Sequence, residues 1–197
     1  MNNRYQQASF AFSANREDQL AADARIEIAF AGRSNAGKSS ALNTLTNQKA
    51  LARVSRTPGR TQLINYFALP EPGCYLVDLP GYGYAKTSRE SRKVWAKFIE
   101  EYFLHAEELR FVCLLLDIRH TPMESDRRMF DWLVEHDIPV LVIATKADKI
   151  GKNARRTQIA AMQKALGVPE LTILPYASPK NEGRCELLDV MKEYLVE

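Results

Sequence analysis

A glycine-rich segment near the N-terminus has the residue types and spacing that bind phosphate. It reads Gly-Arg-Ser-Asn-Ala-Gly-Lys-Ser over residues 32–39 and follows an apolar run at residues 26–30. Glycines let backbone N–H groups converge on an anion where a helix begins. Lys38 is then expected to neutralise β- and γ-phosphate charge, and the Ser39 hydroxyl to bind Mg²⁺. The alternative is a plain glycine-rich turn, but the position between a strand and a helix favours a nucleoside triphosphate site.

Two later segments are predicted to meet the same phosphates. Residues 78–81, Asp-Leu-Pro-Gly, end an apolar run, and they offer Asp78 to the magnesium shell and the Gly81 N–H to the γ-phosphate. An ordinary strand-ending turn is the alternative. In the turn-rich residues 56–62, Thr61 is expected to reach the metal, with Thr57 as its competitor.

The base is predicted from residues 145–148, Thr-Lys-Ala-Asp, at the end of another apolar run. A carboxylate at Asp148 accepts from guanine N1–H and the exocyclic amino group together, whereas it repels the lone pair on adenine N1. The Lys146 stem is expected to lie against the purine. Backbone N–H groups of Ala177 and Ser178 are expected to close the site. The predicted ligand is therefore a guanine nucleotide.

These motifs lie where strands end in a regular alternation of strands and helices. Strands are predicted at residues 25–31, 63–69, 74–78, 110–117, 138–145 and 171–174, and helices at 38–46, 89–105, 124–136, 154–166 and 182–196. Strands this apolar are covered on both sides, so we predict an α/β fold with a mainly parallel six-stranded sheet and helices on both faces. Ligands of such sheets bind at the carboxyl ends of the strands.

Composition limits the remaining choices. The chain has 197 residues, 46% hydrophobic and 26% charged, which is typical of a folded globular protein. We expect residues 1–24 to be an N-terminal extension and residues 25–197 a single domain. The apolar runs are too short to span a membrane, and no signal for export is present, so a cytoplasmic protein is expected. Cys74, Cys113 and Cys185 lack the spacing of a disulfide framework or a zinc site.

The motif-bearing stretches resemble one family of GTPases. Residues 27–43, 57–62, 78–85 and 145–148 are similar to the EngB family, also called YihA or YsxC, of the TrmE-Era group of translation-factor-class P-loop GTPases. The resemblance extends from about residue 8 to the end. It implies a G domain that binds GTP with Mg²⁺, hydrolyses it to GDP and phosphate, and assists assembly of the large (50S) ribosomal subunit. It also implies a link to cell division and septation, with ribosomal RNA and ribosomal proteins as partners of a monomer.

The motifs and the resemblance together define the expected site. Lys38, Thr61 and Asn35 are the expected catalytic residues, and Ser39 and Thr61 the expected metal ligands. The residues expected to contact nucleotide are Gly32, Arg33, Ser34, Asn35, Ala36, Gly37, Lys38, Ser39, Ser40, Gly59, Arg60, Thr61, Asp78, Leu79, Pro80, Gly81, Thr145, Lys146, Ala147, Asp148, Ala177 and Ser178. The last guanine motif, around residues 176–180, is a loose match to the family pattern.

Hydrolysis is expected to be slow without help. Many GTPases use a glutamine after Asp-x-x-Gly to orient the attacking water, but here that position is Tyr82. In the TrmE-type loop an asparagine at the place of Asn35 is associated with K⁺, which implies K⁺ as a further cofactor. The alternative is that Asn35 only caps the loop.

Basic residues suggest a polyanionic partner. No Asp or Glu occurs between residues 28 and 70, and further Lys and Arg residues gather at 86–97. Both groups lie beside the expected switch segments, so RNA affinity is predicted to depend on the bound nucleotide, although a solvated charged surface is the alternative. Two rival functions are a metabolic phosphotransferase, for which no lid is evident, and a nonhydrolysing nucleotide-gated scaffold acting in division.

Overall fold

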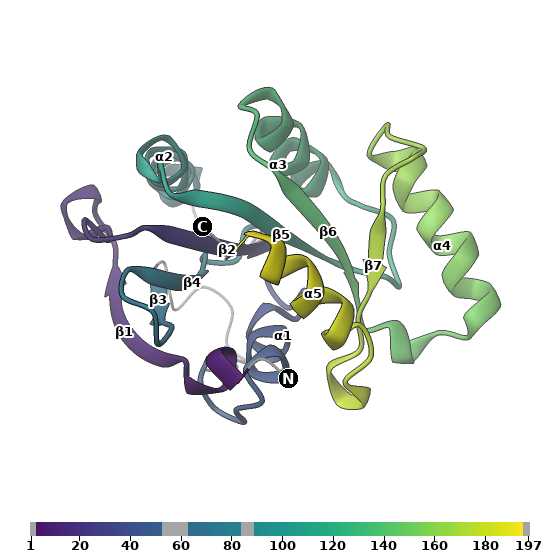
Figure 1. Cartoon of the computed structure of the whole chain (residues 1–197). Coiled ribbons are helices and arrows are strands. Elements are labelled where there is room, and N and C mark those ends of the chain that lie inside the picture. Colours follow the sequence, from purple (N-terminus) through teal and green to yellow (C-terminus); the bar gives the residue numbers. More distant parts are fainter. Residues whose placement is uncertain (1–2, 53–62, 84–88, 195–197) are drawn as a thin grey trace.

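The chain folds into one twisted sheet with helices on both faces (Figure 1). The computed structural model describes residues 3–52, 63–83 and 89–194. The strands are β1 (Ser9–Ala14), β2 (Ile26–Gly32), β3 (Ile64–Ala68), β4 (Cys74–Asp78), β5 (Leu109–Asp117), β6 (Val140–Thr145) and β7 (Ile173–Pro175). The α-helices are α1 (Lys38–Leu45), α2 (Arg89–His105), α3 (Glu124–Glu135), α4 (Lys152–Ala165) and α5 (Arg184–Tyr194). Short 3₁₀ helices lie at η1 (Asn3–Gln7), η2 (Glu17–Gln19), η3 (Ala147–Lys149) and η4 (Ser178–Lys180).

The strand order is β1-β3-β4-β2-β5-β6-β7. The pairs from β4 through β2, β5 and β6 to β7 are parallel, and β3 is antiparallel to both of its neighbours. This confirms the predicted α/β class and the mainly parallel sheet. The strand number is corrected from six to seven, because residues 9–14, predicted to lie in an extension, form β1.

Side-chain contacts hold β1 on the sheet. The Phe12 ring stacks on Tyr66 with 4.6 Å between centroids, and the Ser13 hydroxyl donates to Asn65 Oδ1 at 2.7 Å. Only one residue of β1 is fully buried, so its sequence lacks the continuous apolar run that marked the buried strands. Edge strands of this kind are the hardest to predict, because packing on a neighbour rather than their own composition stabilises them.

Two apolar cores lie on opposite faces of the sheet. Alternate residues of β2 serve both, since Ala29 and Ala31 belong to one core and Ile28 and Phe30 to the other. The first core packs under α2, α3 and α4, and the second under α1 and α5, as the two groups of helices in Figure 1 show. Burial on both faces explains why the central strands are apolar throughout.

The strand order brings the predicted motifs to one edge of the sheet. β2 lies between β4 and β5, and β6 follows β5, so the segments after all four strands start side by side. Gly32 is packed so closely against β5 that a Cβ there would lie 2.7 Å from the Leu115 carbonyl oxygen. In the described part of the chain, none of the helices has the length and apolar character needed to cross a bilayer.

Candidate functional site

The phosphate loop, residues 32–39, turns sharply between β2 and α1. Asn35 and Gly37 both have positive φ, at 63° and 100°, and the second value is one that glycine adopts readily. The Ala36 N–H donates to the Arg33 carbonyl at 3.0 Å, which closes the turn. The N-cap residue of α1, Gly37, makes no side-chain capping hydrogen bond. The first N–H groups of α1, whose first residue is Lys38, can therefore donate to an anion.

Residues 79–82 run directly beside this loop. The Tyr82 N–H donates to the Gly32 carbonyl at 3.3 Å, and the Ser34 N–H donates to the Tyr82 carbonyl at 3.0 Å. A Cβ on Gly81 would lie 3.0 Å from the Ser34 nitrogen and 3.3 Å from Lys38 Nζ. The glycine predicted to sense the γ-phosphate therefore contacts the lysine predicted to bind it.

The Asp78 carboxylate has the features of a cation ligand. Its Oδ1 atom is buried and has no hydrogen-bond partner among the described residues. Burial raises the pKa of Asp78, and the charge of Lys38 opposes that rise. Hard cations such as Mg²⁺ prefer oxygen ligands, and Ser39 lies in the first turn of α1, next in the chain to Lys38, whose charge acts on Asp78. Ser39 and Asp78 thus fit a divalent cation together with phosphate oxygens.

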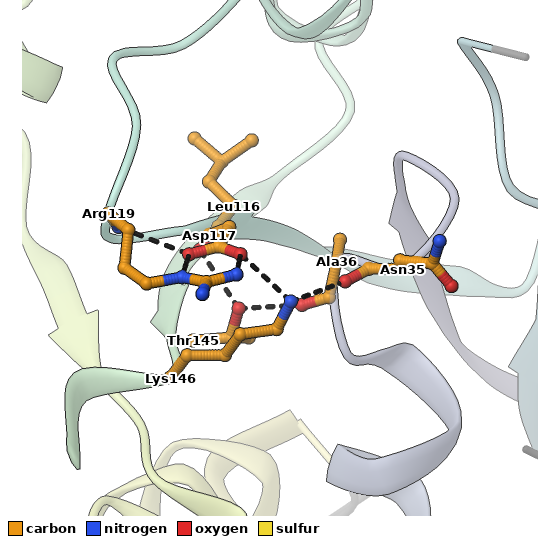
Figure 2. Close-up of polar contacts among 7 residues, drawn as sticks. All are labelled: Asn35, Ala36, Leu116, Asp117, Arg119, Thr145 and Lys146. Carbon is orange, nitrogen blue, oxygen red and sulfur yellow. Dashed lines mark hydrogen bonds and ion pairs between the residues drawn. The ribbon is translucent and has the colours of Figure 1, made fainter. Parts of the chain in front are cut away.

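The middle of the loop, at Asn35 and Ala36, is joined by polar contacts to residues at the carboxyl ends of β5 and β6 (Figure 2). The buried Thr145 hydroxyl lies 2.6 Å from the Ala36 carbonyl oxygen and 3.1 Å from that of Leu116. Lys146, with φ 59°, donates from Nζ to the Asn35 carbonyl at 2.7 Å and to Asp117 Oδ2 at 2.8 Å. The lysine stem is thereby held across the end of the phosphate loop, where it can cover one face of a purine.

Sequence reasoning missed Asp117 and Arg119, which complete this network. Arg119 donates to the Asp117 carboxylate from Nε at 2.9 Å and from Nη2 at 2.7 Å. Burial would raise the pKa of Asp117, but the hydrogen bonds from Arg119 and Lys146 outweigh it and hold the pKa well below its usual range. The carboxylate is therefore charged while it anchors Lys146. An Asp at the end of a strand was the available signal, but the sequence does not show that Lys146, which follows β6, lies beside it.

Asp148 lies in η3 beside the turn that follows β7. The Lys149 side chain lowers the pKa of Asp148 and pairs with its Oδ2 at 3.0 Å. The Ala147 N–H donates to the Tyr176 carbonyl at 3.1 Å, which joins the two turns. The Ala177 N–H donates to the Glu182 carbonyl at 3.0 Å, so it is already used. Of the two N–H groups predicted to contact the base, those of Ala177 and Ser178, only that of Ser178 is therefore kept as a candidate.

Tyr82 and Arg33 face α3. The Tyr82 hydroxyl donates to Asp126 Oδ1 at 2.9 Å, and the ring is buried in the core under α3. A Cβ on Gly83 would lie 2.9 Å from Arg33 Nε. The Arg33 side chain thus lies beside Gly83, and the Tyr82 hydroxyl is engaged by Asp126.

Most of the residues predicted to contact nucleotide lie together at one edge of the sheet. They are those of the phosphate loop, residues 78–81, residues 145–148 and Ser178. Gly59, Arg60 and Thr61, with the competitor Thr57, lie outside the described residues.

Strand order, phosphate loop and base-binding segment together define a G domain, the class of P-loop protein that binds guanine nucleotides. Comparisons with known proteins agree. A family model described as a 50S ribosome-binding GTPase matches residues 27–146. The chain is 51% identical over 184 residues to the probable GTP-binding protein EngB of Escherichia coli O139:H28 (strain E24377A / ETEC), covering 92% of this chain and 87% of that protein.

The EngB protein of Salmonella newport (strain SL254) is 48% identical over the same length, with the same coverage of both chains. A crystal structure of a probable GTP-binding protein EngB superimposes with a TM-score of 0.69 at 24% identity, covering 85% of this chain and 97% of that one, and supports the fold. The chain belongs to the EngB family of GTP-binding proteins. It is a GTPase, which confirms the resemblance and the activity predicted from the motifs.

Proposed function

We propose that this GTPase is a switch in assembly of the large ribosomal subunit, which it binds in the GTP state and leaves after hydrolysis. The description of the matching family names ribosome binding. The observation that carries the switch is the contact of Gly81 with Ser34 and Lys38. A γ-phosphate held by Lys38 must touch the segment that begins at Gly81, so its loss changes the conformation of that segment.

Mg²⁺ is proposed as the resident metal, held by the Ser39 hydroxyl with Asp78 in its shell and Thr61 as a further ligand. When bound it would neutralise charge on the phosphate oxygens. Lys38 and the N–H groups of the loop hold the phosphates in place, and Asp148 with the Ser178 N–H orients the guanine. The unpartnered oxygen of Asp78 supports this assignment.

Intrinsic hydrolysis is proposed to be slow. The Tyr82 hydroxyl is occupied by Asp126, so the residue after the Asp-x-x-Gly motif does not position the attacking water. Asn35 is proposed to bind K⁺, and its exposed side chain points away from the Asp117 network (Figure 2). Turnover in KCl is expected to exceed turnover in NaCl at equal ionic strength, and Asn35→Ala should abolish the difference. Equal rates for the unchanged protein in the two salts would remove this idea.

Co-sedimentation tests the switch. The protein is mixed with purified large and small ribosomal subunits, in GDP and in a nonhydrolysable GTP analogue. Binding to the large subunit in the analogue and its loss in GDP is the expected result. Equal sedimentation in both nucleotides would contradict a switch, and sedimentation with neither subunit would contradict a ribosomal role.

Measurements of phosphate release distinguish the proposed switch from two rival functions. A nonhydrolysing scaffold would release no phosphate when ribosomal subunits are added, whereas the proposed switch should release it faster than the free protein. A metabolic phosphotransferase would transfer phosphate to a small acceptor rather than to water. A role in cell division and septation is proposed from the resemblance, and depletion in cells should yield incomplete large subunits before division fails. A cytoplasmic location and a monomeric state are proposed as well.

A further inference from the structure

The helix α4 carries four cations without an acidic residue, whereas α1, which also lacks acidic residues, carries one cation. The cations of α4 are Lys152, Arg155, Arg156 and Lys164, and no Asp or Glu occurs from residue 149 to residue 169. The helices α3 and α5 mix both signs. Because the whole chain carries only +3, α4 is a concentrated source of positive charge.

Three of these cations are free to act on a partner. Arg155 is partly buried and pairs with Glu182, whereas Lys152, Arg156 and Lys164 are exposed. No ion pair joins these three to a carboxylate in the described part of the chain. They recur at four- and eight-residue spacing, so they form a row along the helix, the α4 basic row, about 18 Å long at 1.5 Å per residue.

The position of the row works against the stability of the helix. Lys152 lies in the first turn, where the partial positive charge of the helix N-terminus repels cations, and no acidic residue compensates there. Selection for folding alone favours Asp or Glu at this place. An unpaired cation here is better explained by an external anion than by the fold.

The chemistry of the exposed face identifies the anion. Besides the row it presents Asn153 and Thr157, polar side chains that hydrogen-bond to phosphate and ribose. The apolar residues Met162 and Ile159 face the core, so the surface lacks the exposed apolar anchors that membranes and most protein partners use. Nucleic acid binding needs no such anchor, since phosphate contacts supply most of its nonspecific affinity.

We propose that the α4 basic row binds the phosphate backbone of RNA, an inference that rests on the proposed ribosomal function and names one docking surface for it. Figure 1 shows α4 at the β7 end of the helical layer, with α2 at the other end. Arg155 and Glu182 hold the turn carrying the exposed Lys180 near the start of α4, which extends the positive surface. The row thus lies on a different helix from Lys93 and Lys97 of α2, and it adds phosphate contacts to those that depend on the bound nucleotide.

The test compares two variants with the same loss of charge. Lys152→Gln with Arg156→Gln removes two members of the row, and Arg128→Gln with Lys192→Gln removes two exposed cations from α3 and α5. Binding of a short fluorescein-labelled RNA duplex is measured across a salt series. The first variant should bind about tenfold or more weakly at about 0.1 M salt, with the slope of log K against log salt smaller by about 2. The matched variant should bind as the unchanged protein does.

Further readouts exclude a structural role. The first variant should keep its GTP turnover and its melting temperature, because the helix dipole disfavours Lys152 and Arg156 is exposed without an ion pair among the described residues. RNA binding equal to that of the matched variant would overturn the proposal. So would binding of the row to anionic phospholipid vesicles in place of RNA, which would make it a membrane surface.

Sedimentation with large subunits separates this inference from the function on which it rests. If the unchanged protein sediments with them and both double variants do so equally, the proposed function stands and the row is not its RNA contact. If the unchanged protein sediments with no subunit, the ribosomal function fails, and the duplex measurement still decides whether the row binds RNA.

Discussion

At the residue scale, two neighbouring carboxylates at the carboxyl ends of β5 and β6 have different tasks. Asp148 carries the predicted contact with the base, whereas Asp117 contacts Lys146 and Arg119 and is turned toward the protein. Both have a lowered pKa, through different partners, so both are charged near neutral pH. In the proposed function Asp148 recognises the guanine base, whereas Asp117 holds the side chain of Lys146 in place.

Replacing Asp148 by Asn should change the preferred base. The carboxamide offers one acceptor where guanine presents two donors, and its NH₂ group suits the extra oxygen of xanthine. GDP affinity should fall about 100-fold and XDP affinity should rise, which competition against a fluorescent nucleotide measures. Asp189→Asn, which neutralises an exposed carboxylate on α5, is the control. Unchanged GDP affinity in Asp148→Asn would exclude this residue from base recognition.

Replacing Asp117 by Asn should weaken nucleotide binding, although Asp117 is not one of the residues expected to contact the nucleotide. Lys146 would lose its ion pair with residue 117 and keep only the hydrogen bond to the Asn35 carbonyl. Arg119 would lose the negative charge that both of its hydrogen bonds reach. The binding free energy should fall by about 1–2 kcal/mol. GDP dissociation, followed by nucleotide exchange, should therefore be about tenfold faster. Because the effect passes through Lys146, it should largely disappear in a Lys146→Ala background. Additive effects of the two substitutions would show that Asp117 acts by another route.

At the scale of elements, the important juxtaposition is that of residues 79–82 with the phosphate loop. Two backbone hydrogen bonds join Tyr82 to residues 32 and 34, and the Tyr82 side chain joins the same segment to α3. Tyr82, the last residue of this segment, is thus fixed through both its backbone and its side chain. Loss of the γ-phosphate can move the segment only if it weakens these contacts.

Gly81→Ala should separate nucleotide binding from turnover. The new Cβ would lie 3.0 Å from the Ser34 nitrogen and 3.3 Å from Lys38 Nζ, so the segment must move away from the γ-phosphate. GDP affinity should change less than about threefold, whereas single-turnover GTP hydrolysis should slow by about tenfold or more. Gly151→Ala is the matched control, because nothing lies within 4 Å of its Cβ position and its φ of −70° suits alanine. Hydrolysis at the normal rate in Gly81→Ala would refute a role for this contact.

At the scale of the whole molecule, a buried acid links β2 to α2. Glu27 accepts a hydrogen bond of 2.7 Å from the Tyr102 hydroxyl, and only 3% of the residue is exposed. Burial raises the pKa of Glu27 to about 7, and the charges of Asp23 and Glu108 add to the rise, while the Tyr102 hydrogen bond opposes it. Between its usual pKa of 4.5 and 7, the folded protein therefore holds a proton that the unfolded chain has released.

This difference makes stability depend on pH. The contribution of Glu27 is largest below about pH 4.5, falls as the pH rises to about 7 and is constant above, by a total on the order of 3 kcal/mol. Urea unfolding at about pH 5 and pH 8 should show this loss in the unchanged protein and not in Glu27→Gln. If the free energy of unfolding depended on pH in the same way in both proteins, Glu27 would have its usual pKa in the fold.

The sequence alone determined the parts of the site that consecutive residues build. The phosphate loop needs its glycines and Lys38 at set distances along one stretch of backbone, and Asp148 acts within a short segment after one strand. These motifs predicted the class of ligand, the fold and the family, and the structure and comparisons confirmed the fold and family. The boundaries of β4 and α2 were also predicted without error, because each has a continuous apolar or periodic pattern.

Only the tertiary structure decided what depends on pairing between distant residues. β1 joins the sheet because its aromatic side chains pack on β3, and Asp117 matters because β6 brings Lys146 to its carboxylate. The Ala177 N–H is used by Glu182, a contact made only once the turn after β7 folds. Such contacts join residues far apart in the chain or depend on a particular turn, so no pattern along the sequence records them.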